Sequence, residues 1–357
     1  MLKVVKRTES GPLQATLNRI LSVLIALLAA ALVIKLLGYD PFIVYKEMIK
    51  GSLGSAYCLK ETINKAIPLL VMGLGVAVCF KMKFSNIGTE GQFYMGALGA
   101  TYVALNYSSL PAVILLPLMF IVAFIMGGIW CLIAALLKLR WNANETLVTL
   151  MMNYIAIKLV SYLQYGPWRD PKAYGFPKIA NFPKNAWLPE VLGVHCGWII
   201  ATVLTVFIYI LFSRSKLGYE ISVMGESPLT AKYAGLDTTK IFLIAILLGG
   251  GLSGAAGMLQ ASGIERTLND QLSGSLGFTA VIVAWMAQLS PIIIFIVSFF
   301  FAVLLQGGSY IQSALQIPSA AALILQGIIL LFVLGSEFFT QYKIVYESDE
   351  DKGALSA

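Results

Sequence analysis

The chain has 357 residues, of which 58% are hydrophobic and 12% are charged, whereas soluble domains carry about a quarter charged residues. Residues 271–336 contain no Asp, Glu, Lys or Arg, and one membrane span needs about 20 apolar residues. These features exclude a soluble protein and predict an all-α protein embedded in a lipid bilayer. The net charge of +7 comes from scattered basic residues without interleaved aromatic residues, so we expect no nucleic acid as a partner.

Apolar segments predict about ten transmembrane helices within residues 20–339. The expected spans are 20–38, 63–81, 90–107, 110–137, 146–165, 194–213, 240–262, 274–290, 291–312 and 319–339. The first span follows a basic segment, as the core of a signal peptide does. Its apolar stretch, residues 20–37, is longer than such a core, which favours an uncleaved first span.

The distribution of Lys and Arg sets the expected orientation. A cytoplasmic N-terminus, residues 1–19, places more basic residues in the cytoplasmic segments than in the outer ones, as the positive-inside rule requires. An even number of spans then puts the acidic tail, residues 340–357, in the cytoplasm as well. We therefore expect a multi-pass protein of the cell membrane with both termini inside.

The expected outer loop, residues 166–193, contains five prolines and two tryptophans. Proline-rich backbone cannot cross lipid unsupported, so this loop should lie on the outer surface. It either docks an extracellular partner or forms a lid whose tryptophans sit at the membrane interface.

The expected cytoplasmic loop, residues 214–239, contains the signals of a separate short helix. Ser227 is a good N-cap and Pro228 suits the first helical position. Gly235 suits the left-handed residue that ends a helix, and Leu236 can pack back against it. We predict a two-turn helix from Ser227 to Gly235, which either binds a partner or rests on the membrane surface.

The seventh expected span carries small residues at intervals of four, which predicts the close approach of another helix in lipid. These residues are Ala245, Gly249, Ser253, Gly257 and Ala261. In the fifth expected span, Lys158 lies at membrane depth. An ionised lysine there needs a partner or water, so we expect it to face the protein interior.

Two polar clusters stand where expected spans begin. The residues concerned are Asn86, Glu90 and Gln92 in the first cluster and Asn144 and Glu145 in the second. Thr89 with Gln92, and Asn142 with Glu145, have the spacing of helix caps, and the helix dipole favours an acidic residue in a first turn. The clusters either border a translocation path, as at broken helices that line cavities, or cap helices and join the spans.

Motifs for enzymatic chemistry are absent from the sequence. It has no GxxxxGK[ST] loop for ATP, no HExxH and no GxSxG, so we expect no catalytic residues. Its four cysteines form no CxxC pair and only one histidine accompanies them, so we expect no metal and no cofactor. A disulfide between Cys58 and Cys196, both expected near the outer face, stays open.

Three stretches resemble the permeases of ABC importers for simple sugars and nucleosides, the ribose-type permease superfamily. Residues 86–92, Asn-Ile-Gly-Thr-Glu-Gly-Gln, are similar to the family's first signature. Asn144-Glu145 with residues 149–154 resembles its second membrane motif. Residues 225–236 resemble its cytoplasmic coupling segment, although positions 228–230 depart from the usual asparagine and alanines. The resemblance covers residues 60–340, and the glutamate-glycine-glutamine form looks most like the nucleoside-type permeases.

The resemblance implies a type II-like ABC importer permease architecture and a path for nucleosides, with ribose or another simple sugar as the alternative solute. It implies three protein partners: a second permease subunit, identical or different, a cytoplasmic ABC ATPase and an extracytoplasmic solute-binding protein. The path would be bordered by Asn86, Glu90, Gln92, Asn144, Glu145 and Asn153. The ATPase would be coupled through Glu226, Ser227, Ala231, Lys232, Tyr233 and Gly235.

Other functions fit a multi-span chain less well. An ion-coupled secondary transporter would need several mid-span carboxylates, and few are present. A membrane scaffold would need neither the capped cytoplasmic helix nor the polar clusters. An intramembrane enzyme lacks a suitable histidine.

Overall fold

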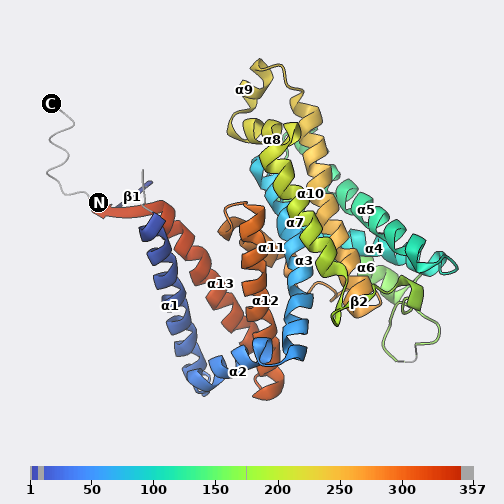
Figure 1. The fold of residues 1–357 in the computed structure, drawn as a ribbon, viewed down its shortest axis with the longest axis horizontal. Coiled ribbons are helices and arrows are strands. Elements are labelled where there is room, and N and C mark those ends of the chain that lie inside the picture. Colours follow the sequence, from blue (N-terminus) through green and yellow to red (C-terminus); the bar gives the residue numbers. More distant parts are fainter. Residues whose placement is uncertain (1, 7–11, 174, 347–357) are drawn as a thin grey trace. The chain divides into compact units, whose positions relative to one another are not determined.

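The computed structural model describes residues 2–6, 12–173 and 175–346, and this part of the chain is mostly helical (Figure 1). The helices are α1 (Pro12–Leu36), α2 (Pro41–Leu53), α3 (Ala56–Lys81), α4 (Thr89–Asn106), α5 (Ala112–Trp141), α6 (Glu145–Tyr165), α7 (Gly197–Arg214), α8 (Lys216–Glu226), α9 (Pro228–Tyr233), α10 (Thr238–Gln260), α11 (Leu276–Met286), α12 (Pro291–Ala314) and α13 (Ser319–Gln341). Shorter elements are the 3₁₀ turn η1 (Lys184–Ala186) and the π-helical turn η2 (Ala261–Glu265). Strand β1 (Leu2–Lys6) pairs antiparallel with β4 (Tyr342–Tyr346), and β2 (Glu190–Val191) with β3 (Val194–His195).

A helix lies at each expected span, but the expected number of spans is not confirmed. Six helices in the described part are long and apolar enough to cross a membrane, or up to seven if the bent pair α1 and α2 is one span. Helix α11 has only 11 residues, and α4 opens with polar residues. The location of the termini is not confirmed either, and the acidic residues of the tail lie outside the described residues.

Two helices occupy segments that were expected to be loops. Helix α2 begins after Asp40, whose carboxylate accepts the backbone N–H groups of Phe42 (2.8 Å) and Ile43 (3.3 Å). Helix α8 begins after Ser215, whose hydroxyl accepts the N–H of Gly218 at 3.0 Å. Both starts follow the usual capping rules. Hydropathy misses such helices because they are short and not apolar throughout.

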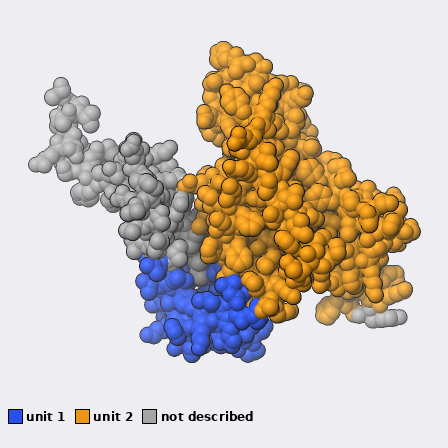
Figure 2. All heavy atoms as spheres, in the orientation of Figure 1, with its two compact units in different colours: residues 1–55, 304–357 blue, residues 56–303 orange. Residues whose placement is uncertain are grey.

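The described chain divides into two compact units (Figure 2). Unit 1 consists of residues 1–55 and 304–357, and unit 2 consists of residues 56–303. In unit 1, α1 packs against α13, and Gly51 of α2 lies so close to the ring of Tyr310 in α12 that no side chain fits there. Gly308 makes a similar close contact with Gln326 of α13.

Helix α10 is the centre of unit 2 and packs against α3, α4 and α5. A Cβ atom at Gly254 would lie 2.9 Å from Cα of Gly127 in α5, and one at Gly249 would lie 2.7 Å from the carbonyl oxygen of Gly75 in α3. A Cβ atom at Gly257 would collide with the carbonyl oxygen of Phe93 in α4. The predicted close approach is therefore confirmed. The small residues serve three neighbouring helices, because Gly250 and Gly254 form a second contact face beside the predicted stripe.

Residues 166–173 and 175–196 lie at one end of unit 2. The side-chain amide of Asn185 donates to the carbonyls of Ser108 and Leu110, both at 2.7 Å. The backbone N–H of Leu188 donates to Ser262 at 3.2 Å, which ties the segment to the end of α10. Burial lowers the pKa of His195 in this segment to about 4, so its imidazole is neutral.

The cysteines near this end are not bridged. No disulfide joins Cys58 to Cys196 in the described structure, and both side chains are half-buried. Burial raises the pKa of the Cys196 thiol, so it is largely protonated at neutral pH.

We predict that Gly254→Ala destabilises the protein, because the added methyl group would press against the backbone of α5. Overpacking of this kind costs about 1–3 kcal/mol. Gly327→Ala is the matched control, since a Cβ at Gly327 meets nothing within 4 Å. Thermal unfolding of the purified protein in detergent should show a clear drop in melting temperature for the first variant alone. Equal melting temperatures would contradict the importance of this contact.

Candidate functional site

The first polar cluster occupies the irregular segment 82–88 and the first turn of α4. The side-chain amides of Asn86 and Gln92 pair twice, from Gln92 Nε2 to Asn86 Oδ1 (2.9 Å) and from Asn86 Nδ2 to Gln92 Oε1 (3.2 Å). Asn86 Oδ1 also accepts the N–H of Gly88 at 2.9 Å. Helix α4 begins at Thr89 as predicted. The predicted capping box is wrong, because the side chain of Gln92 is engaged by Asn86 and that of Thr89 makes no cap.

Helix α6 supplies hydrogen-bond partners for this irregular backbone. Asn153 Oδ1 accepts the N–H of Gly91 at 2.7 Å, and its Nδ2 donates to the carbonyl of Ile87 at 2.8 Å. Thr149 Oγ1 accepts the N–H of Ile87 at 3.2 Å. Position 91 leaves little room for a side chain, because a Cβ there would lie 3.0 Å from Cα of Asn153. Two side chains of α6 therefore replace the partners that a continuous helix would have provided.

Glu90 connects the start of α4 to the start of α11. Its side chain is buried, and its Oε2 atom accepts the N–H of Gly277 at 2.7 Å. Its Oε1 atom accepts the hydroxyl of Ser273. One turn further along α4, the hydroxyl of Tyr94 donates to the carbonyl of Asp270 at 2.9 Å. The carboxylate thus lies in the first turns of two helices, where both dipoles favour negative charge.

The irregular segment 266–275, between η2 and α11, is also held by α6. Ser161 Oγ donates to Asp270 Oδ2 at 2.8 Å, and the N–H of Asp270 donates to Gln164 Oε1 at 3.0 Å. These contacts extend one polar network from α4 across α6 to α11. Sequence reasoning missed Ser161, Gln164, Asp270 and Ser273, because their partners lie more than 100 positions away in the chain.

The structure brings four of the six predicted path residues together: Asn86, Glu90, Gln92 and Asn153. All four are at most 2% exposed within this chain. Their side-chain polar groups bind other groups of the protein. Irregular backbone at membrane depth is tolerated when it is buried and hydrogen-bonded in this way.

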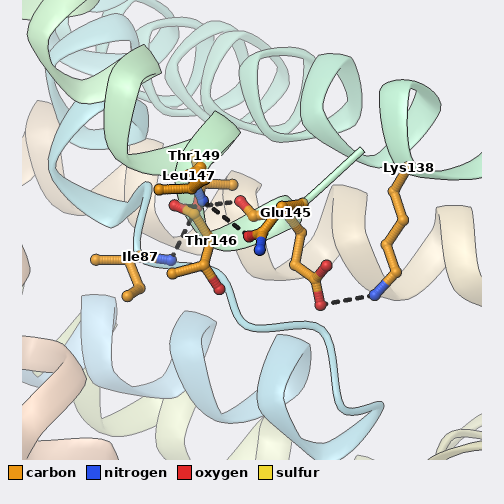
Figure 3. A network of polar contacts seen from close by, with 7 residues as sticks. Ile87, Lys138, Glu145, Thr146, Leu147 and Thr149 are labelled. Carbon is orange, nitrogen blue, oxygen red and sulfur yellow. Dashed lines mark hydrogen bonds and ion pairs between the residues drawn. The ribbon is translucent and has the colours of Figure 1, made fainter. Parts of the chain in front are cut away.

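The other two predicted path residues stand where α6 begins, with Asn144 as its N-cap and Glu145 as its first residue. Figure 3 shows Glu145 beside Lys138. Glu145 forms an ion pair with Lys138 of α5, with 2.7 Å between Oε1 and Nζ. Asn144 is exposed and caps α6 by accepting the N–H of Leu147 at 3.1 Å. The cap expected at Asn142 is wrong, because Asn142 ends α5 in the left-handed conformation.

A second face of α6 is open. Lys158 is exposed within the chain, so the expectation that it faces the interior is wrong. No hydrogen bond or ion pair joins its ammonium to the described residues. Tyr154 and Tyr162, one turn before and one turn after it, are 55% and 64% exposed. A lysine with two tyrosines on a membrane-spanning helix requires water or another chain beside it, since hydrocarbon would leave the ammonium unsolvated.

The predicted helix from Ser227 to Gly235 is confirmed. Ser227 Oγ accepts the N–H of Thr230 at 3.2 Å, and the N–H of Leu236 donates back to the carbonyl of Ala231 at 3.1 Å. Gly235 has the expected left-handed conformation, with φ of +76°. Ala231 is buried and anchors α9 to the chain, whereas the remaining predicted coupling side chains reach the surface to differing degrees. Tyr233 is 91% exposed.

Helix α8 connects α9 to the end of α3. Gly225 packs against the carbonyl of Lys81 so closely that a side chain would not fit. Lys83 Nζ donates to the carbonyl of Glu226 at 3.2 Å. Lys83 belongs to the irregular segment 82–88, which leads directly into the polar network. These contacts connect α9, through α8, to the segment that precedes α4.

Within the described residues, no group of three or more His, Cys, Asp or Glu side chains could hold a metal ion. The acidic residues of the network are instead paired with hydroxyl and backbone N–H donors. Unit 2 is thus a packed membrane domain with a buried polar network. The face of α6 that carries Lys158 is open, and the short helix α9 is exposed.

The sequence matches a known transport family over residues 58–334, which is described as branched-chain amino acid transport system / permease component. It is 34% identical over 338 residues to the glucose ABC transporter permease protein TsgB13 of Haloferax volcanii, covering 91% of this chain and 88% of that protein. It is 28% identical to the guanosine ABC transporter permease protein NupP of Bacillus subtilis, covering 89% and 92%. It is 26% identical to the nucleoside ABC transporter permease protein NupB of Lactococcus lactis, covering 81% and 82%.

These matches agree with the resemblance that the polar motifs indicate. They leave the secondary transporter, the scaffold and the intramembrane enzyme without support. The ATP-hydrolysing activity of such systems resides in a separate subunit. The chain therefore belongs to the family of ABC transporter permease components and is a multi-pass protein of the cell membrane.

Proposed function

We propose that the chain is the permease subunit of an ATP-driven importer and forms a translocation path for nucleosides. The observation that carries this proposal is the exposed, capped helix α9, which is joined through α8 to the polar network. In the proposed type II-like topology of about ten spans, α9 and both termini face the cytoplasm and residues 166–196 face outward.

Helix α9 is proposed as the contact with a cytoplasmic ABC ATPase. Leu229, Lys232 and Tyr233 present an apolar and cationic surface, and Ala231 anchors the helix from below. Ser227 and Gly235 define its two ends, and Glu226 joins it to α8. If the ATPase binds two permease states with different affinity, ATP binding shifts the permease between them through this contact.

The translocation path is proposed to run along the open face of α6. Tyr154 and Tyr162 offer rings for stacking on a nucleobase or a sugar, and Lys158 offers hydrogen-bond donors. Asn86, Glu90, Gln92 and Asn153 border this path as positioning residues, because they fix α4, α6 and α11 relative to one another. Asn144 and Glu145 border its cytoplasmic end.

We propose that a second permease subunit completes the path, since the exposed Lys158 needs water or another chain beside it. A homodimer and a heterodimer would both provide this second chain.

We further propose that an extracytoplasmic solute-binding protein delivers the solute to the side formed by residues 166–196.

A simple sugar is the second candidate solute. The observation in its favour is the 34% identity to a permease whose name specifies glucose. Nucleosides are favoured by the glutamate-glycine-glutamine motif and by the relatives named for guanosine and nucleosides. Both solutes carry hydroxyl groups that amide, hydroxyl and ammonium side chains can bind.

We expect deletion of the gene to abolish uptake of radiolabelled uridine or adenosine. This uptake should fail on ATP depletion while the ion gradient is maintained, because hydrolysis drives the cycle. Labelled ribose and glucose serve as the competing solutes in the same cells. Loss of sugar uptake with intact nucleoside uptake would assign the sugar as solute and contradict the nucleoside proposal. Uptake that follows the ion gradient alone would contradict ATP coupling.

We expect Tyr233→Ala to weaken ATPase binding by about tenfold or more, as truncation of an exposed aromatic anchor does at interfaces. Solute-stimulated ATP hydrolysis by the reconstituted complex should fall with it. Tyr107→Ala is the matched control, since Tyr107 is also exposed but follows α4 at the opposite end of unit 2. Unchanged ATPase activity in both Tyr233→Ala and Ala231→Arg would exclude α9 as the coupling contact.

We expect Asn153→Ala to reduce both stability and uptake, because it leaves the N–H of Gly91 and the carbonyl of Ile87 buried and unpaired. Each unpaired group costs about 1–3 kcal/mol. Asn106→Ala removes an exposed asparagine from the other end of α4 and should change neither. The readouts are the melting temperature in detergent and the initial uptake rate. A wild-type melting temperature for Asn153→Ala would rule out the positioning role.

A further inference from the structure

A groove lies between α5 and α7, beneath the residues that connect α6 to α7. It has a volume of about 960 Å³ and belongs entirely to unit 2. Its floor and walls include the apolar side chains of Leu116 and Phe120 on α5 and Ile200 on α7. Aliphatic and aromatic walls of this kind are a poor match for a sugar or a nucleoside, whose hydroxyl groups would remain without partners.

The rim of the groove carries charge. Lys184 and Arg266 line it together with one carboxylate, that of Glu190. Arg266 Nη2 lies 3.6 Å from Glu190 Oε1, and its guanidinium carbon lies 3.9 Å from the ring centre of Trp187. Lys184 is exposed, and no carboxylate within the described residues pairs with it. The rim therefore has an excess of positive charge above an apolar floor.

The rim is rigidly built. Trp187 Nε1 donates to the carbonyl of Phe182 at 2.9 Å, and the N–H of Phe182 donates to the carbonyl of Arg266 at 2.8 Å. Two chain segments that are far apart in sequence thus hold Trp187 and Arg266 in contact before any ligand binds. Tryptophan and basic residues are typical of the headgroup level of a bilayer.

The groove lies among exposed apolar side chains. Both α5 and α7 are long and apolar enough to cross a membrane, and both are mostly exposed within the chain. Val113, at the wall of the groove near the start of α5, is 84% exposed. A lipid molecule can therefore enter sideways, with its headgroup at the charged rim and its acyl chain along the apolar floor.

We propose that this groove binds one anionic phospholipid, with the phosphate held by Lys184 and Arg266 and an acyl chain against Leu116 and Phe120. The site rests on the proposed function only for its orientation, which places it in the outer leaflet. The bound lipid bridges α5, α7 and residues 182–190, which cover this end of unit 2.

The test uses the full chain purified in detergent and depleted of lipid, together with any sibling permease that copurifies with it. Native mass spectrometry compares retention of dioleoyl phosphatidylglycerol with that of dioleoyl phosphatidylcholine, which has the same acyl chains and no net charge. We expect phosphatidylglycerol to be retained about fivefold more strongly, as one or two basic residues at a phosphate provide. Equal retention of the two lipids would overturn the proposal.

Charge reversal locates the site. Lys184→Glu should remove most of the preference for phosphatidylglycerol. Lys172→Glu, an equally exposed lysine in the same connecting segment but outside the groove, should keep it. The proposal fails if the two variants behave alike, because the preference would then reflect the overall charge of the surface.

A second readout needs no change in the groove. Cys196 lines it, and Cys79 and Cys131 are buried, so a Cys58→Ser background leaves Cys196 as the accessible thiol. Phosphatidylglycerol should slow maleimide labelling of Cys196 more than phosphatidylcholine does. Labelling that neither lipid alters, or protection by a second copy of the chain without lipid, would overturn the proposal. None of these measurements requires solute or ATPase, so their failure is distinguishable from failure of the transport function.

Discussion

Backbone-to-backbone contact around α10 is the constraint on which unit 2 depends. Gly249, Gly250, Gly254 and Gly257 allow α3, α4 and α5 to approach so closely that a methyl group would collide with main-chain atoms. In lipid, helices gain nothing by hiding apolar surface from one another, so this close packing supplies the association energy. One central helix thereby fixes three neighbours at once.

The same packing explains why the polar network is buried. Helices α4 and α11 both begin inside unit 2, where the first-turn residues Glu90 and Gly277 are shielded from solvent. The first N–H groups of any helix lack partners within that helix, and in a membrane they cannot turn to water. Asn153 and Glu90 supply these partners from the side. The residues that resemble a family signature thus also provide hydrogen bonds that hold the helix starts in place.

Helix α6 has two faces with different surroundings. One of its faces carries Thr149, Asn153 and Ser161 and holds the network together. The other presents Lys158 between two tyrosines and remains open in the single chain. At one end of the unit, Lys83 ties the start of α4 to α8 and hence to α9. Packed and hydrogen-bonded groups thus connect α9 with α4 and α6.

Local features of the sequence are enough to predict the membrane class, the positions of the hydrophobic helices and the short helix α9. Hydropathy, helix caps and glycine conformation are local properties, so residues such as Ser227 and Gly235 reveal their roles without a partner. Packing between distant helices, in contrast, places the starts of α4 and α11 inside the unit, pairs Gln92 with Asn86 and leaves Lys158 exposed. Each of these three features depends on contacts between helices that are far apart in the sequence. Periodicity can give the face of a helix, but the neighbour of that face is set by the packing of all the helices together.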